Sequence, residues 1–172
     1  SNSVLDERTL RELYLSAFEA AVKEGKPSTV MCSYPKLNDI HCSDNKELLA
    51  DILRDEWGFD GMVVTDWGAM NDRIEGFRAG CDLNMPGGSE YMEKEALQAV
   101  KNGTLSEDCV NKAARRVLKL VFRASETLKG ENSCDYESHH ALAKRAATEG
   151  AVLLKNEGSI LPLKQNKKIA VI

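Results

Sequence analysis

The chain has 172 residues, of which 42% are hydrophobic, and it carries a formal net charge of -4 at pH 7. This size and composition are typical of a soluble globular chain of about one domain. Lysine and arginine are interspersed with acidic residues, and no apolar run approaches the roughly 20 residues that cross a bilayer, so neither a nucleic acid nor a membrane is an expected partner.

The five cysteines are spaced widely and irregularly, and no two of them form a CxxC pair. An odd number at such spacings argues against both a disulfide framework and a zinc site. We therefore predict reduced core thiols and no bound metal, and on the same ground we expect a cytoplasmic location. The five are Cys32, Cys42, Cys81, Cys109 and Cys134.

The first predicted helix covers residues 10–22, where apolar side chains recur every three or four positions, and Gly25 ends it. A strand is predicted at about 29–34. A loop over residues 35–39, with proline, asparagine and aspartate, then leads into a second helix. One face of that helix carries Leu48, Leu49, Ile52 and Leu53.

The next apolar run, residues 62–64, shows no alternation, which predicts a strand buried on both faces, as in a parallel sheet. It stops abruptly at Asp66 and Trp67. A short helix at about 72–78 separates it from a strand at 81–85, and this alternation of strands and helices predicts a parallel sheet with helices outside. Side chains at the carboxyl ends of such strands line active sites, which makes Asp66 a candidate catalytic carboxylate.

Helices dominate the rest of the chain. One is predicted at about 93–101, and a strongly amphipathic one begins at Ser106. Its basic residues Arg115, Arg116 and Lys119 are interpreted as a solvated face. A further helix is expected at 141–148. An apolar run, 152–154, and a final strand, 168–172, complete the pattern.

Only three or so strand-helix units are visible, whereas a closed barrel of this type takes eight. The fold class is therefore predicted as α/β, a partial barrel of the (β/α)8 type followed by a helical linker and the first strand of a second α/β domain. Open strand edges in such a piece leave amides and carbonyls unpaired, so self-association of the isolated chain is one expected remedy.

Six motifs, in this order and spacing, resemble those of the glycoside hydrolase family 3 β-glucosidases. Their combination is far more specific than any one of them alone. They are residues 7–14 (ERTLRELY), 30–34 (VMCSY), 53–61 (LRDEWGFDG), 65–67 (TDW), 79–87 (AGCDLNMPG) and 152–163 (VLLKNEGSILPL).

The resemblance implies a domain organisation. Residues 1–124 are expected to form the C-terminal part of the glycosidase barrel, residues 125–163 an interdomain linker with a helix, and residues 164–172 the truncated start of a second α/β domain. The rest of the same polypeptide is then the principal partner of this chain.

The resemblance also implies a mechanism without metal or organic cofactor. Asp66 matches the family nucleophile, which forms a covalent glycosyl-enzyme, and Tyr34 matches the tyrosine that orients it. Trp67, Met31 and Met85 match substrate-binding positions. A retaining glycosidase also needs a second carboxyl group about 5 Å away as acid and base. In two-domain members this group lies in the second domain, so the isolated fragment is expected to be inactive, while its parent hydrolyses terminal non-reducing β-D-glucosyl residues of oligosaccharides or β-glycosides.

Other interpretations stay open. A β-xylosidase or an N-acetylhexosaminidase of the same family would share most of the motifs. Pro35 and Asp39 stand where the family commonly has asparagine and glycine, which keeps a non-catalytic carbohydrate-binding or assembly module open. By position alone, an aspartate after a strand is more often a turn or helix cap, and Tyr34 and Trp67 would be packing residues.

Overall fold

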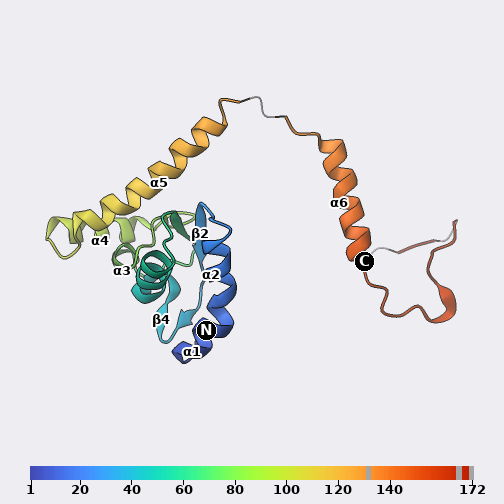
Figure 1. Cartoon of the computed structure of the whole chain (residues 1–172), viewed down its shortest axis with the longest axis horizontal. Coiled ribbons are helices and arrows are strands. Elements are labelled where there is room, and N and C mark those ends of the chain that lie inside the picture. The colour runs from blue at the N-terminus through green and yellow to red at the C-terminus, as the bar shows by residue number, and fades with distance from the viewer. Residues whose placement is uncertain (131–132, 166–167, 171–172) are drawn as a thin grey trace. The chain divides into compact units, whose positions relative to one another are not determined.

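The computed structural model describes residues 1–130, 133–165 and 168–170 of the chain. They belong to two compact units, residues 1–130 and 131–172 (Figure 1). The first unit mixes helices with parallel strands, as predicted for an α/β chain. Its strands are β1 (Asn2–Ser3), β2 (Thr29–Cys32), β3 (Lys36–Leu37), β4 (Ile40–His41) and β5 (Met62–Thr65).

The central pairing joins β2 and β5 in parallel, with Cys32 opposite Thr65. Val63 and Thr65 are fully buried on one face of β5, and on the other face Met62 is buried while Val64 is only partly so. The predicted burial of both faces is therefore complete on one face only. A parallel bridge between Val64 and Leu83 adds a third segment beside β5. The carboxyl ends of these three segments therefore lie next to one another.

The strand predicted at 81–85 is wrong in extent, because only the bridge at Leu83 forms. Two side chains take the place of ladder bonds around it. Asp82 Oδ2 accepts the N–H of Val63 at 2.8 Å, and Thr65 Oγ1 accepts the N–H of Met85 at 2.9 Å. Backbone groups that a regular parallel ladder would pair are thus satisfied by side chains instead.

The loop predicted at 35–39 is in fact a short hairpin of β3 and β4. Asn38 and Asp39 both have positive φ, 48° and 69°, the conformation of a tight hairpin turn. β3 also pairs in parallel with β1, and Asn38 Oδ1 accepts the N–H of Leu5 at 2.9 Å. An asparagine-aspartate pair between two-residue strands gave too weak a pattern for prediction.

The N-terminal helix begins at Glu7, capped by Asp6, and ends at Lys23. It consists of α1 (Glu7–Thr9), a π-helical segment η1 (Leu10–Leu15) and α2 (Ser16–Lys23). The predicted helix is confirmed, but its apolar face is only partly covered. Among the described residues, Leu13, Tyr14 and Phe18 stay exposed while Leu10, Leu15 and Val22 are buried.

The core lies between the β2–β5 pair and the helices packed on it. A short 3-10 turn η2 (Cys42–Asp44) leads to the π-helix η3 (Glu47–Glu56), which buries Leu49, Ile52 and Leu53 as predicted. The short helix α3 (Arg73–Ala79) is capped by Asp72 and stops at Gly80, which has a φ of 93°.

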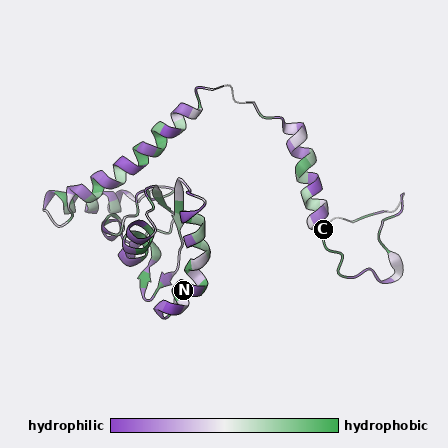
Figure 2. Ribbon diagram, in the orientation of Figure 1, coloured by the Kyte–Doolittle hydropathy of each residue, from purple (hydrophilic) through white to green (hydrophobic). Residues whose placement is uncertain are grey.

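Two longer helices follow, α4 (Glu90–Lys101) and α5 (Glu107–Thr127). Hydrophobic and hydrophilic bands alternate along α5 (Figure 2), yet Ala113 is its one buried residue among those described. Leu118, Val121 and Phe122 on its apolar face are exposed. The prediction that Arg116 lies on a solvated face is wrong, because it contacts the buried Asp82.

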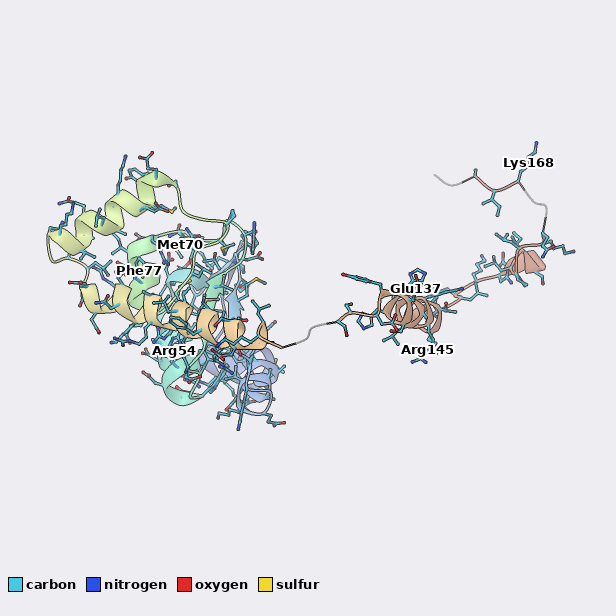
Figure 3. All side chains as sticks on the ribbon, turned by 90° about the horizontal axis from the view of Figure 1, so that it is seen from above. Arg54, Met70, Phe77, Glu137, Arg145 and Lys168 are labelled. Carbon is cyan, nitrogen blue, oxygen red and sulfur yellow. The ribbon has the colours of Figure 1, made fainter. Side chains whose placement is uncertain are left out.

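The second unit contains α6 (Tyr136–Gly150), capped by Asp135, and a short 3-10 turn η4 (Glu157–Ser159). Its labelled residues Glu137, Arg145 and Lys168 are visible in Figure 3. The apolar run 152–154 has no regular structure. Residues 168–170 of the predicted final strand are likewise irregular, and 171–172 lie outside the described residues.

All five cysteines are free thiols. Cys32, Cys42 and Cys81 are buried as predicted, whereas Cys134 is exposed and Cys109 is partly so. The prediction of a core thiol is therefore wrong for Cys134, which precedes α6 in a unit whose described residues are almost all exposed.

Within the described ranges, no helix is long and apolar enough to span a membrane.

Candidate active site

Asp66 lies at the carboxyl end of β5, at the start of a tight turn. Its N–H donates to the carbonyl of Cys32 at 3.0 Å, and its own carbonyl accepts from the N–H of Ala69 at 3.1 Å. The half-buried side chain accepts the N–H of Trp67 at its Oδ1, at 2.6 Å. These bonds hold the carboxylate where β2 and β5 end together.

Tyr34 reaches the same turn from the end of β2. Its hydroxyl donates a hydrogen bond to the carbonyl of Trp67, not to the carboxylate of Asp66. Both residues are about half exposed, 51% for Tyr34 and 58% for Trp67. Tyr34 therefore binds the backbone of the turn that follows Asp66, and both aromatic residues present much of their surface outward.

Met85 joins this group from the third segment. Its N–H donates to Thr65 Oγ1 at 2.9 Å, and its carbonyl accepts from the N–H of Gly68 at 2.8 Å. Four of the five residues singled out in the sequence thus meet at one edge of the sheet. They are Asp66, Trp67, Tyr34 and Met85.

Met31 lies apart from that turn. It stands opposite Val64 in the β2–β5 register and lines an apolar pocket of about 520 Å³ together with Tyr14 and Phe18 of the N-terminal helix. Neither Asp66 nor Trp67 lines this pocket. Met31 itself is 58% exposed, so it faces open space beside β2.

A largely buried cluster of charged side chains, Arg54, Asp82 and Arg116, packs beside β5. Arg54 Nη2 lies 2.7 Å from Asp82 Oδ2, and Arg116 Nη1 lies 2.9 Å from Asp82 Oδ1. Arg54, labelled in Figure 3, also donates to the carbonyls of Gly61 and Gly80, at 3.0 Å each. Burial lowers the pKa of Arg54, an effect that the charge of Asp82 opposes. That Arg54 and Arg116 bind Asp82 was not predicted from the sequence. Arg54 lies in one of the family motifs, residues 53–61, which could have pointed to it, whereas the helix pattern does not distinguish Arg116 from its neighbours.

A second arginine braces the same segment. Arg73 donates to the carbonyls of Cys81 and Asp82 at 3.2 and 3.0 Å, and its guanidinium lies 3.6 Å from the ring centroid of Phe77. Burial lowers its pKa as well. Together these contacts fix the segment that leads to Met85.

Histidine, cysteine and acidic side chains are not grouped for metal binding within residues 1–130, 133–165 and 168–170. His139 Nδ1 lies 3.3 Å from Cys134 Sγ in the second unit, which is a pair and not a ligand set. The carboxylate of Asp66 accepts one backbone N–H, that of Trp67, and Tyr34 donates to the backbone of the same turn. This arrangement suits a carboxylate that acts on an uncharged substrate with an apolar face.

A comparison with protein families matches residues 2–120 to the glycosyl hydrolase family 3 N-terminal domain. The chain belongs to glycosyl hydrolase family 3. This family 3 chain is 50% identical over 171 residues to thermostable beta-glucosidase B of Acetivibrio thermocellus, a match that covers 99% of the chain and 23% of that relative. It is 41% identical over 157 residues to an exo-alpha-(1->6)-L-arabinopyranosidase of Bifidobacterium longum, covering 91% of the chain and 20% of that relative.

Solved structures agree with the family assignment. Beta-glucosidase 3B from Thermotoga neapolitana, in complex with glucose, superimposes with a TM-score of 0.80 and 41% identity over 96% of the family 3 chain and 24% of that structure. A beta-glucosidase of Bifidobacterium adolescentis gives a TM-score of 0.79 at 37% identity, over 94% of this chain and 24% of that one. The chain thus spans about a fifth of the length of the curated relatives that it matches.

Proposed function

We propose that this family 3 chain is one part of a longer polypeptide that hydrolyses terminal β-D-glucosyl residues with retention of configuration, with Asp66 as the nucleophile. The observation that carries the proposal is the position of Asp66. It follows a buried parallel strand, its Oδ1 accepts the N–H of Trp67, and Tyr34 and Met85 approach the same turn. The beta-glucosidases among its relatives support glucose as the sugar.

In the proposed reaction, a carboxylate oxygen of Asp66 attacks the anomeric carbon and forms a glycosyl ester. The bond to the leaving oxygen breaks, and a second carboxyl group protonates that oxygen. The same group then removes a proton from water, which releases the sugar and restores Asp66. The N–H of Trp67 orients the nucleophile, and the exposed ring of Trp67 offers a flat surface to the sugar.

We place the acid/base carboxyl group outside this chain and infer that the isolated chain is inactive. β2, β5 and the segment at Leu83 would be three adjacent strands of an eight-stranded barrel, with residues 1–124 as its C-terminal part. Residues 125–163 would link domains, and 164–172 would begin the next one. The exposed apolar side chains beside β2, which has a single partner strand among the described residues, support contact with the rest of the polypeptide. Self-association of the isolated chain would use the same surface.

L-Arabinopyranose is a second candidate sugar, because of the name of one relative. The Bifidobacterium longum relative, 41% identical to this chain, is named as an exo-alpha-(1->6)-L-arabinopyranosidase. L-Arabinopyranose is also a six-membered ring with an apolar face, so the same nucleophile turn could accept it.

The test is hydrolysis of aryl β-glucosides, β-xylosides, N-acetyl-β-glucosaminides and α-L-arabinopyranosides by the full-length polypeptide. We expect the β-glucoside to react fastest, and proton NMR to show the β-anomer of glucose as the first product. Asp66→Asn should lose roughly 10³-fold or more in kcat. Asp60→Asn, an exposed carboxylate paired with Lys119, is the matched control and should keep its activity. Full activity of Asp66→Asn would refute the proposal.

A further inference from the structure

Thr65 carries a buried hydroxyl group next to the proposed nucleophile. Its side chain has no solvent exposure. Thr65 Oγ1 accepts the N–H of Met85 at 2.9 Å and, at 3.4 Å, donates to the carbonyl of the same residue. One side chain of β5 therefore contacts both polar backbone groups of a residue 20 positions further along the chain.

Backbone hydrogen bonds flank this contact on both sides. The N–H of Thr65 donates to the carbonyl of Leu83 at 3.0 Å, and the N–H of Gly68 donates to the carbonyl of Met85 at 2.8 Å. Between β5 and residues 81–85, regular strand pairing among the described residues is limited to the Val64–Leu83 bridge. Beyond that bridge, the hydroxyl of Thr65 is the acceptor for the Met85 N–H.

The identity of this residue is not explained by packing alone. Val63, two positions earlier on the same face of β5, is fully buried and wholly apolar. A valine at position 65 would have nearly the same shape as threonine. It would, however, leave the N–H of the half-buried Met85 without its acceptor, a loss that a folded protein avoids.

We propose that Thr65 is a positioning residue whose hydroxyl group sets the spacing between the carboxylate of Asp66 and the Met85 segment of the sugar site. The inference rests on the proposed function, in which Asp66 is the nucleophile. Thr65 precedes Asp66 directly, so a shift of the Met85 segment relative to β5 changes the direction from which a bound sugar meets the carboxylate. Misplacement of reacting groups by about 1 Å costs on the order of 10²-fold in rate.

The test compares Thr65→Val and Thr65→Ser in the full-length polypeptide, with an aryl β-glucoside as substrate. Thr65→Val should lower kcat by roughly 10- to 100-fold while KM changes by less than about threefold. Thr65→Ser keeps the hydroxyl group and should stay within about threefold of the parent in kcat. Thr29→Val, on the exposed start of β2, is the control for removing a strand hydroxyl and should leave kcat unchanged.

Melting temperatures are measured for all variants, and assays are run well below the lowest of them. Unchanged kcat in folded Thr65→Val, an effect confined to KM, or an equal loss in Thr65→Ser would each overturn the inference. Asp66→Asn is assayed in parallel to separate the two proposals. An inactive Asp66→Asn with a fully active Thr65→Val refutes the role of Thr65 alone, whereas an active Asp66→Asn refutes the nucleophile itself.

Discussion

Arg116 Nη1 lies 2.9 Å from Asp82 Oδ1, and this contact ties α5 to the segment beside β5. The side chain of Asp82 has no exposure and also binds Arg54 and the N–H of Val63. One buried carboxylate thus holds a helix, a second helical segment and a strand. Because two guanidinium groups depend on it, its removal leaves uncompensated positive charge in the interior.

Asp82→Asn should therefore destabilise the chain strongly. The substitution keeps the size of the side chain but removes the charge, and breaking a buried pair of this kind costs about 3–5 kcal/mol. The free energy of unfolding, measured with urea and tryptophan fluorescence, gives the loss. Asp60→Asn is the matched control. Asp60 Oδ2 lies 2.5 Å from Nζ of Lys119, which is on α5 like Arg116, but this pair is exposed. That control should lose no more than about 1 kcal/mol, and equal losses in the two variants would contradict the prediction.

Acid should weaken the fold through Glu56. Hydrogen bonding to Arg11, 2.6 Å away, lowers the pKa of Glu56 from its ordinary value of 4.5. A folded-state pKa below the unfolded one contributes stability that is present above pH 4.5 and is lost as the pH falls through the lowered value. The pKa of Asp60 is lowered in the same way by Lys119, from 3.8. The free energy of unfolding should therefore fall as the pH drops below 4.5.

The contribution of Glu56 is isolated by a double-mutant cycle. Glu56→Gln should reduce the dependence of stability on pH below 4.5. The same substitution in an Arg11→Gln background should change that dependence far less, because the partner is already absent. Identical pH profiles for Glu56→Gln and the parent chain would rule out the effect.

The helices and the main strands could be predicted because periodicity and capping residues are local signals. The helices predicted at about 72–78 and from Ser106 are α3 and α5, capped by Asp72 and Ser106, and the run before Asp66 is a parallel strand. Asp66 and Trp67 were found because they follow that strand. Tyr34 was expected to orient Asp66, and its hydroxyl instead donates to the carbonyl of Trp67, the next residue.

Long-range contacts of polar side chains could not be predicted. Asp82 sits within a motif, but nothing in the sequence indicates that it pairs with a residue on α5, 34 positions away. The shortened strand at Leu83 has the same origin, because Asp82 and Thr65 use side-chain atoms to satisfy backbone groups. Hydrogen bonds of this kind, from side chains to distant backbone groups, depend on three-dimensional proximity, which the periodicity of a sequence does not reveal.

The cysteines should react in an order set by burial. Cys134 is exposed, Cys109 is intermediate, and the other three are buried. Burial also raises the pKa of Cys42, which leaves less of its reactive thiolate. With Ellman's reagent, one thiol should react first, a second more slowly, and three only after unfolding in urea. Cys134→Ser should abolish the first phase, and rapid reaction of more than two thiols in the folded chain would contradict this order.

A side chain at Gly61 should destabilise the fold. A Cβ atom there would lie 2.4 Å from the carbonyl oxygen of Ser28 and 2.6 Å from the ring of Phe59. Because one of these atoms belongs to the backbone, relief requires a shift of the chain before β5, and Gly61→Ala should cost about 1–3 kcal/mol. Gly150→Ala at the end of α6 meets nothing within 4 Å and is the control, with an unchanged or slightly higher stability. Urea unfolding of both variants measures the difference, and equal stabilities would refute the clash.

Tyr34→Phe should loosen the turn that carries Trp67. The substitution removes the hydroxyl group that donates to the Trp67 carbonyl and keeps the ring. In a Trp57→Phe background Trp67 is the single tryptophan of the chain, so its fluorescence anisotropy should fall and its quenching by acrylamide should rise. Tyr14→Phe, at an exposed tyrosine of the N-terminal helix, is the control and should change neither quantity.

In the full-length polypeptide, the loss of this hydrogen bond in Tyr34→Phe should lower kcat by about two- to tenfold. If kcat falls while the signals of Trp67 stay unchanged, the hydroxyl group acts on Asp66 directly and not through the turn.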